Sequence, residues 1–346
     1  MKPPGLDDTL LDQLLEHLPR LHIAVAGDLF LDRYLDLDAS LTEVSLETGL
    51  DAYQVVRVRA YPGAAGTVVN NLAALGVGRV SVLSVIGDDG EGYELRRELE
   101  AQKVDLRWLR LAPDRRTPTY MKPMLHEPGR PPRELNRLDI QNRSPLAASD
   151  QEAVLLALDA LWSECDGMVV VDQVTTADCG VVKRAFRERL AELARKFPAK
   201  PVLADSRGRI AAFRGVCVKP NRQECCRAAG TDDVWRAVQW LAAQADRPVF
   251  CTCGPEGMVL GHPDGTVEKV PGYPVPGPVD PVGAGDSASA GIICALAAGF
   301  PPRVAAGFGN LVASITVQQI GVTGTATPRQ IRNRWQEIRS LSASDA

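Results

Sequence analysis

Two glycines and one acidic residue stand ahead of a run of small residues in the last third of the chain. Residues 280–291 read Asp-Pro-Val-Gly-Ala-Gly-Asp-Ser-Ala-Ser-Ala-Gly, and the small residues predict a helix from about Ser287. Glycines at 283 and 285 let the backbone turn its N–H groups toward a ligand. The start of a helix adds unpaired N–H donors and the positive end of the helix dipole. Such a site suits an anion, above all phosphate.

Asp286 is the unusual member of this segment, because a carboxylate repels phosphate. Its presence is explained if it removes a proton from a group that attacks the phosphate. The spacing Gly283-x-Gly285-x-x-Ala288 also fits a loose dinucleotide fingerprint. That fingerprint directly follows a strand, whereas a proline-rich loop precedes this segment, so we favour the phosphate site.

The bulk composition is that of an ordinary globular protein. The chain has 346 residues, of which 45% are hydrophobic and 24% charged, and its formal net charge is −4. The mild acidity argues against a nucleic-acid partner or an anionic membrane surface. No apolar run is long enough to cross a bilayer, so we expect no membrane partner.

The eight cysteines and four histidines show no spacing typical of a zinc site. We therefore expect reduced, packed thiols in a cytoplasmic protein. The N-terminus lacks the apolar core of a secretion signal. Leucines between residues 10 and 18 predict an amphipathic helix within an N-terminal segment of residues 1–20.

Short apolar strands alternate with longer helical segments along most of the chain. Strands are predicted at 22–26, 80–86, 167–172, 201–205, 215–219 and 248–252. This alternation predicts an α/β fold with a mainly parallel sheet covered by helices on both faces, a three-layer α/β/α arrangement. Ligands of such sheets bind beyond the carboxyl ends of the strands, where Asp28, Asp205 and Asn221 fall.

Two segments, at about 35–61 and 117–139, do not fit the layered pattern. Their apolar and polar residues alternate as in half-exposed strands. We predict that they form a small β-sheet lid on a main domain of residues 21–335, followed by a C-terminal tail of residues 336–346. Exposed strands offer an edge for pairing, so we expect a homodimer that forms through the lid.

Several of these segments together resemble the PfkB/ribokinase-like carbohydrate kinases. The sequence Asp-x-x-Gly-Ala-Gly-Asp at 280–286 is similar to the C-terminal motif of that family. Residues 27–34, 62–65, 137–139 and 324–327 look most like the kinase domain of bacterial D-glycero-β-D-manno-heptose 7-phosphate kinases. The resemblance spans about residues 20–335 and implies a ribokinase-like fold.

The resemblance implies ATP-dependent phosphorylation of a hydroxyl group on a sugar or a sugar phosphate, with heptose 7-phosphate as a candidate. The acid of the family's motif is the catalytic base, and it carries over to Asp286. The N–H groups of Gly283, Ala284 and Gly285 resemble the family's anion hole, which stabilises charge on the transferring phosphoryl group. The alternative for Asp286 is a helix N-cap.

On the nucleotide side, residues 221–224 look like the family's Asn-x-x-Glu element. The resemblance implies that Glu224 acts on Mg²⁺ through water, with Asn221 near a phosphate. The alternative is that the two residues cap the next helix. Lys219 lies two residues earlier and is placed to reach a phosphate, and Asp205 is a further candidate for the metal shell.

Residues 252–257 resemble the family's nucleotide loop, with Thr252, Gly254 and Gly257 as candidate contacts. Asn310 falls where the family packs beside the adenine. The alternative for these positions is an ordinary role in turns and helix packing. Asp280 and residues 321–325 resemble the monovalent-cation region of many members, which leaves the use of K⁺ open.

On the acceptor side, Asp32 matches the family acid that binds sugar hydroxyls, and a carboxylate can accept hydrogen bonds from a vicinal diol. Gly27 would let the substrate approach closely, and Asp28 follows it at the end of the first strand. Gly63 matches the first glycine of a turn that lines the sugar.

The chain departs from the family's pattern at two acceptor positions. Ala64 replaces the second glycine of the turn, and Thr67 stands where a sugar-binding asparagine is usual. Thr67 lacks the two donors of an amide. Arg137, in the second lid segment, is a candidate for a substrate phosphate.

Two alternative functions stay open. One is a nucleoside or vitamin kinase of the same fold, which the residues at 64 and 67 allow. The other is a non-catalytic sugar- or nucleotide-binding protein on the kinase scaffold. The intact set of Asp286, Asn221 and Glu224 argues against the second alternative.

Overall fold

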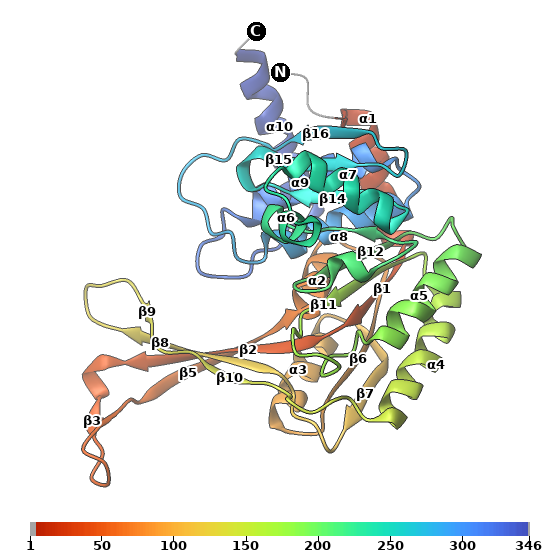
Figure 1. Ribbon diagram of the computed structural model, residues 1–346. Coiled ribbons are helices and arrows are strands. Elements are labelled where there is room, and N and C mark those ends of the chain that lie inside the picture. The colour runs from red at the N-terminus through yellow and green to blue at the C-terminus, as the bar shows by residue number, and fades with distance from the viewer. Residues whose placement is uncertain (1–4, 345–346) are drawn as a thin grey trace.

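The computed structural model describes residues 5–344, and a nine-stranded sheet forms the centre of its body (Figure 1). The strand order is β16-β15-β14-β13-β12-β11-β1-β6-β7. Strands β14 through β7 in this order run parallel, whereas β15 and β16 are antiparallel to their neighbours. The bounds are β1 (His22–Gly27), β6 (Arg79–Gly87), β7 (Asp105–Ala112), β11 (Gly167–Asp172), β12 (Val202–Ser206), β13 (Cys217–Val218), β14 (Val249–Thr252), β15 (Gly257–Gly261) and β16 (Val267–Pro271).

Two hydrophobic cores lie on the two faces of this sheet. Successive side chains of a strand point to opposite faces, so Ile23 and Val25 of β1 join one core while Ala24 and Ala26 join the other. The first core is completed by α1 (Asp8–His17), α2 (Ala65–Ala74), α3 (Gly90–Ala101), α8 (Ala284–Ala297), α9 (Pro302–Thr316) and α10 (Pro328–Ser344). The second is completed by α4 (Ala148–Glu164), α5 (Arg184–Lys196), α6 (Arg222–Ala229) and α7 (Val234–Ala245). The predicted three-layer α/β/α fold is confirmed.

The predicted small sheet is also present, and it projects from one side of the body (Figure 1). Its strand order is β10-β8-β2-β5, with β9 paired to β8. The bounds are β2 (Leu29–Asp38), β5 (Val55–Ala64), β8 (Thr119–His126), β9 (Arg133–Glu134) and β10 (Leu138–Ile140), and a hairpin of β3 (Glu43–Val44) and β4 (Asp51–Ala52) extends it. Strand β2 begins at Leu29, six residues before the predicted start of the lid at residue 35. Its first three residues, Leu29, Phe30 and Leu31, are buried.

The two ends of the described chain lie together on the body. Trp335 of α10 donates its indole N–H to Asp8 of α1 at 2.7 Å. Ile331, Trp335 and Ile338 are buried and recur at helical spacing. The predicted boundary at residue 335 therefore falls inside α10, whose backbone continues as a helix through residue 344. Residues 1–4 and 345–346 of the predicted terminal segments lie outside the described residues.

No helix within residues 5–344 combines the length and the apolar character needed to span a membrane. Short 3₁₀ turns complete the described elements: η1 (Leu18–Arg20), η2 (Ala39–Leu41), η3 (Ile210–Ala212) and η4 (Gly254–Glu256).

Candidate active site

The glycine-rich segment forms the mouth of α8. Gly283 is the N-cap with φ +78°, and α8 begins at Ala284, three residues earlier than predicted. A Cβ on Gly283 would lie 2.6 Å from Thr323 Cγ2, so both the backbone angle and the space require glycine. Asp286 lies in the first turn of α8 rather than at its N-cap, which removes the capping alternative for this residue.

One part of the predicted anion hole is engaged within the chain. The Ala284 N–H donates to the Pro281 carbonyl at 3.1 Å, which closes the turn before the helix. Within the described residues the N–H groups of Gly283 and Gly285 have no such backbone partner. The mouth of α8 therefore offers two glycine N–H groups, and Ala284 serves the turn that presents them.

A lysine and a carboxylate from two neighbouring strands lie at this mouth. Lys219, which follows β13, is 3% exposed, and its Nζ lies 2.8 Å from Asp205 Oδ2 at the end of β12. The same Nζ would be 3.5 Å from a Cβ on Gly285. The ammonium group thus lies against the first turn of α8, beside the predicted position of a phosphoryl group.

The charges around Asp286 are not balanced. Burial, followed by repulsion from Asp205, raises the pKa of Asp286 to about 7, although Lys219 and Arg207 act in the opposite direction. Burial by itself acts to lower the pKa of Lys219, but attraction from Asp205, Asp286 and Glu224 is stronger and leaves this pKa above its ordinary value. A carboxyl group that titrates near neutrality can exchange a proton at the working pH, as a general base must.

Asn221 and Glu224 form the capping box of α6, the alternative considered for them. Glu224 N–H donates to Asn221 Oδ1 at 2.8 Å, and Asn221 N–H donates to Glu224 Oε2 at 2.9 Å. Burial raises the pKa of Glu224, and repulsion from Asp205 acts in the same direction. The two carboxylates of Asp205 and Glu224 are thus close enough to influence each other.

The donor set at this point fits Mg²⁺ rather than a metal that needs several protein ligands. No group of three or more His, Cys, Asp or Glu side chains within the described part of the chain is arranged to hold a metal. Mg²⁺ commonly binds one or two carboxylates and takes its other ligands from water and phosphates. Asp205 and Glu224 supply such a pair.

The predicted nucleotide loop lies beside the Asn221 segment. Thr252 N–H donates to the Pro220 carbonyl at 2.9 Å, and Thr252 forms a parallel bridge with Asn221. Gly254 has φ +58° and open space where a Cβ would be. A Cβ on Gly257 would lie 2.3 Å from Gly272 N, so packing against the backbone after β16 accounts for this glycine.

Two further predicted residues hold loops together. Asn310 of α9 donates its amide to the carbonyls of Val270 and Pro271, both at 3.1 Å, and so fixes the end of β16. Asp280 accepts the Gly321 N–H at 3.0 Å through Oδ2, which joins both parts of the predicted monovalent-cation region.

On the acceptor side, Asp32 and Gly63 lie directly against each other. A Cβ on Gly63 would lie 3.0 Å from Asp32 Cγ. Lys122 Nζ, from β8, is 3.4 Å from Asp32 Oδ2. Burial raises the pKa of Asp32 in spite of Lys122. Lys122 was not among the predicted site residues, although it lies within the predicted lid segment of residues 117–139.

Gly27 and Asp28 have roles other than the predicted contact with substrate. A Cβ on Gly27 would lie 2.1 Å from the Val171 carbonyl oxygen, so this glycine admits the backbone of β11. Asp28 is 3% exposed, and its carboxylate accepts the N–H groups of Gln173, Val174 and Val181 at 3.0, 3.0 and 2.7 Å. A buried carboxylate occupied in this way fixes the loop after β11 and is not free for a sugar.

The two departures from the family's pattern lie between the acceptor and anion sides. Ala64, the N-cap of α2, has φ +53° and ψ −117°, a conformation that glycine adopts far more readily. Thr67 is 4% exposed, and its Cγ2 would lie 3.5 Å from a Cβ on Gly283. Thr67 thus packs against the mouth of α8 from the first turn of α2.

Arg137 lies in the lid with its charge paired. Its guanidinium group binds Asp139 at 2.7 and 2.9 Å and lies 4.1 Å from the centre of the Tyr120 ring. Arg207, which was not predicted, acts on the pKa of Asp286, whereas Arg137 acts on the pKa of Asp32. Its position two residues after Asp205, at the end of β12, was the available signal.

Three comparisons with known proteins bear on the family and the fold. Residues 34–329 match the family described as "pfkB family carbohydrate kinase". A curated relative, "Bifunctional protein HldE" of Trichlorobacter lovleyi, is 30% identical over 334 residues, which is 94% of this chain and 65% of the relative. The protein of the same name from Geobacter metallireducens is 31% identical over 329 residues, 93% of this chain and 64% of the relative. The chain therefore spans less than two thirds of each relative.

Solved structures support the fold. Arabidopsis thaliana ribokinase complexed with ribose and ATP has a TM-score of 0.66 at 16% identity, covering 91% of this chain and 98% of that one. Escherichia coli phosphofructokinase-2 in complex with potassium has a TM-score of 0.68 at 17% identity, covering 92% and 99%. A putative ribokinase II from E. coli with ATP and Mg²⁺ has a TM-score of 0.65 at 18% identity, covering 92% and 99%.

Proposed function

Because the chain belongs to the pfkB family of carbohydrate kinases, we propose that it transfers the terminal phosphoryl group of ATP to a hydroxyl group of a sugar or sugar phosphate. The observation that carries the proposal is the position of Asp286. Its carboxyl group, with a pKa of about 7, lies in the first turn of α8 beside the Gly283 and Gly285 N–H groups and the Lys219 ammonium. A base and phosphate-binding donors are thereby joined in one place.

Each residue contributes a separate part of the reaction. Asp32 accepts hydrogen bonds from acceptor hydroxyls, and Gly63 leaves space beside it. Asp286 takes the proton of the attacking hydroxyl group as its oxygen bonds to the terminal phosphorus of ATP, and the bond from that phosphorus to the leaving ADP breaks. The glycine N–H groups and Lys219 stabilise charge on the transferring group. Mg²⁺, held by Asp205 and Glu224 through water, would neutralise charge on the nucleotide phosphates.

The lid supports two further parts of the proposal. Closure of β2, β5 and β8 over the acceptor would exclude water, which is itself an acceptor for the phosphoryl group. The lid also exposes apolar side chains, with Val44, Leu50, Val56 and Val58 exposed by 65, 69, 55 and 48%. An exposed apolar sheet is an interaction surface, and we propose that a second copy covers it in a homodimer.

Heptose 7-phosphate is the first acceptor to test, on the resemblance of residues 27–34, 62–65 and 137–139 to heptose 7-phosphate kinases. We place the reaction in the cytoplasm, where ATP is plentiful and the eight cysteines, all free in the described structure, would stay reduced. Dependence of the activity on K⁺ is tested by measuring ADP release with Na⁺ in place of K⁺.

The proposal is tested by ADP release with ATP, Mg²⁺ and a panel of acceptors. The panel includes heptose 7-phosphate, the free heptose, fructose 6-phosphate, ribose and a nucleoside. We expect release with at least one sugar or sugar phosphate, and its loss in Asp286→Asn. Asp114→Asn, at an exposed aspartate outside the site, is the matched control. Release with the nucleoside alone would favour the nucleoside-kinase alternative, and nucleotide binding without release for any acceptor would favour a binding protein.

A further inference from the structure

A small cavity lies on the body between the loop after β11 and the start of α5. Its volume is about 130 Å³. A water molecule occupies about 30 Å³ in the liquid, so the cavity has room for one small oxyanion and some water. Its polar lining consists of Asp178, Lys183, Arg187 and Arg209, and small or apolar residues complete it. None of these residues belongs to the lid or to the charged groups around Asp286, so the cavity is separate from the candidate active site.

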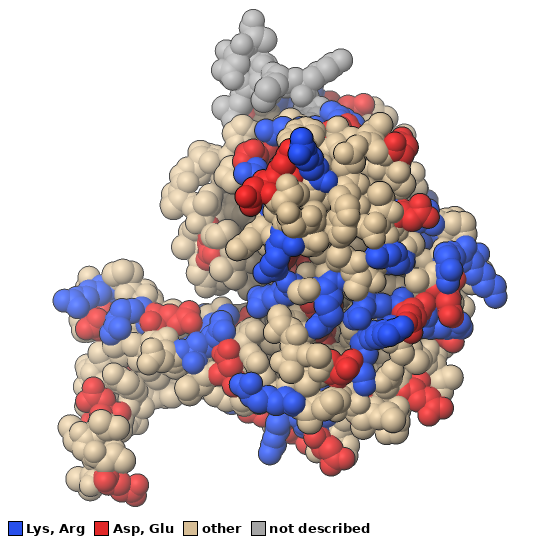
Figure 2. Space-filling model, in the orientation of Figure 1, with Lys and Arg blue, Asp and Glu red and all other residues tan. Residues whose placement is uncertain are grey.

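Two of the three cations at this cavity have only carbonyl oxygens as partners. Lys183 Nζ donates to the Leu146 carbonyl at 3.3 Å. Arg187 Nη1 donates to the Val182 carbonyl at 2.8 Å. Across residues 5–344 neither side chain forms an ion pair, and both are half-buried. Figure 2 shows Lys and Arg side chains gathered across the middle of the molecule, in the part of the view where β11 and α5 lie in Figure 1. A carbonyl has no net charge, so both positive charges stay uncompensated beside the cavity.

The acids near the cavity do not balance these cations. Arg209, the third cation, is paired with Asp172 at 2.5 Å. Asp178 is the one acid among the lining residues, and it is exposed. Burial lowers the pKa of Arg187, attraction from Asp172 opposes this shift, and repulsion from Arg209 adds to it. The cavity therefore favours an anion. Two unpaired cations, one of them a guanidinium group with paired N–H donors, suit a doubly charged oxyanion such as phosphate.

The loop that borders the cavity is the one that encloses Asp28. A Cβ on Gly180, which lines the cavity, would lie 2.9 Å from Asp28 Oδ1. The next residue, Val181, donates its N–H to the same oxygen at 2.7 Å. The Asp28 carbonyl in turn accepts the N–H of Ala65, the first residue of α2, at 3.1 Å. The loop is thus joined through Asp28 to the beginnings of β2 and α2, on the acceptor side.

We propose that this cavity binds a phosphate-type dianion, either inorganic phosphate or the phosphoryl group of a metabolite, between Lys183 and Arg187. The bound anion is an effector and not a reactant, since it neither gives nor receives a phosphoryl group there. The inference therefore goes beyond the proposed kinase activity. An anion in this place offsets the repulsion between Arg187 and Arg209 and joins the start of α5 to the loop after β11. Because that loop encloses Asp28, occupancy stabilises the folded state around the acceptor side.

The first test is calorimetric titration with inorganic phosphate, in the absence of nucleotide and acceptor. We expect wild type to bind, and Arg187→Gln and Lys183→Gln each to weaken the binding at least about tenfold, the usual loss for one charge-assisted contact. Arg184→Gln is the matched control, because Arg184 is an exposed cation of the same helical turn that does not line the cavity. Thermal unfolding of each variant checks that it is folded. Tighter binding of glycerol 3-phosphate than of inorganic phosphate would assign the site to a phosphorylated metabolite, and the reverse order to the free ion.

Two further measurements separate this cavity from the candidate active site. Lys219→Gln removes the ammonium group at the mouth of α8 and should keep the phosphate binding that depends on Arg187. Amide hydrogen exchange should slow on phosphate addition within residues 173–183, above all at Val181, and this slowing should be absent in Arg187→Gln. No binding to wild type, or binding lost in Lys219→Gln alone, overturns the site, and unchanged exchange in the loop overturns the effector role. Neither measurement needs turnover, so a failure of ADP release with every acceptor would remove the kinase proposal and leave this inference standing.

Discussion

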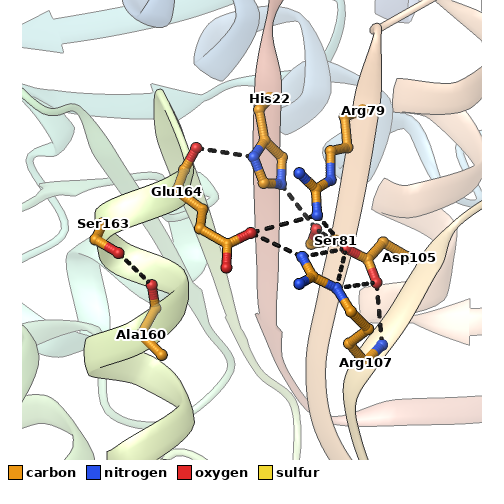
Figure 3. Close-up of polar contacts among 8 residues, drawn as sticks. All are labelled: His22, Arg79, Ser81, Asp105, Arg107, Ala160, Ser163 and Glu164. Atoms are coloured by element: carbon orange, nitrogen blue, oxygen red, sulfur yellow. Dashed lines mark hydrogen bonds and ion pairs between the residues drawn. The ribbon is translucent and has the colours of Figure 1, made fainter.

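Two polar clusters lie at opposite ends of the central sheet and differ in how their charges are balanced. One lies at the amino ends of β1, β6 and β7 and at the end of α4. It comprises His22, Arg79, Ser81, Asp105, Arg107 and Glu164 (Figure 3). The other is the candidate active site at the carboxyl ends of β12 and β13 and the start of α8, with Asp205, Lys219 and Asp286 at its centre.

The cluster at the amino ends is internally satisfied. Asp105 binds Arg79 at 2.7 Å and Arg107 at 2.9 Å, and Arg107 also binds Glu164 at 2.7 Å. Burial acts to raise the pKa of Asp105, but the hydrogen bonds from Arg107 and Arg79 outweigh it and hold this pKa well below its ordinary value. His22 contacts Ser81 Oγ at 2.7 Å through Nε2, and its pKa is lowered by burial.

The cluster at the candidate active site has the opposite electrostatics. The carboxylates of Asp205, Asp286 and Glu224 all attract the single ammonium group of Lys219. The pKa of Asp286 is raised rather than lowered. A paired carboxylate contributes to stability, whereas a carboxylate kept short of partners costs stability and gains reactivity. Charged residues in a buried or half-buried network therefore do not identify an active site by themselves. A raised pKa does not identify one either, since burial also raises the pKa of the structural Asp28.

The largest expected effect is on turnover in Asp286→Asn. We expect kcat to fall about 10³-fold, within the range for loss of a general base. The same substitution should leave thermal stability equal or higher at pH 8. The sign follows because the native pKa is above the unfolded one, so wild-type stability falls as pH rises through about 7. ADP release and thermal unfolding measure the two quantities, and a large loss of stability would place Asp286 with the structural cluster.

The pH dependence of kcat/KM comes next in size. Since the proposed reaction needs ionised Asp286, we expect kcat/KM to rise about tenfold per pH unit below about 7 and to level off above it. Asp205→Asn should move this limb to lower pH, because Asp205 raises the pKa of Asp286 and competes for Lys219. The charged groups that act on the pKa of Asp286 are Asp205, Lys219, Arg207 and Asp32. If Asp205→Asn leaves the pH at which kcat/KM rises unchanged, Asp205 does not raise the pKa of Asp286.

In the amino-end cluster, Asp105→Asn should act on stability and spare activity. We expect the free energy of unfolding at pH 7 to fall by about 1–2 kcal/mol, limited by the exposure of Arg79 and Arg107. The wild-type advantage is complete above the ordinary Asp pKa of about 4 and is lost as pH falls through the lowered native value. Urea unfolding at pH 7 and pH 3 measures this, with Asp114→Asn as control. A fall in kcat with no fall in the free energy of unfolding would show that Asp105 serves activity rather than stability.

The smallest expected effect concerns backbone strain beside Asp32 and Gly63. Ala64→Gly should raise the free energy of unfolding by about 1 kcal/mol, because glycine adopts φ +53°, ψ −117° without a Cβ clash. Ala65→Gly, one residue further in α2, should lower it by about 0.5–1 kcal/mol. Denaturant unfolding of the two variants gives the comparison. Equal losses in both would show that residue 64 is not strained.

Much of the molecule was predictable from local patterns. The alternation of apolar strands and helices predicted the α/β/α layers, and the alternation within 35–61 and 117–139 predicted a separate small β-sheet. Both sheets are confirmed, whereas closure of the small sheet as a lid stays a prediction. The motif at 280–286 led to the family, also confirmed. The individual site roles stay predictions, apart from Asp28 and Gly27, whose contacts are to the protein itself.

The sequence by itself determined which segments form strands and helices and that Asp286 follows two glycines, because periodicity, glycine and helix starts are local properties. Only the tertiary structure decided which charges meet. Asp28 and Asp32 are four residues apart, yet one is buried under three N–H donors and the other faces Gly63 and Lys122. The balance of charge that separates a structural carboxylate from a reactive one depends on partners from distant segments, and no local pattern records them.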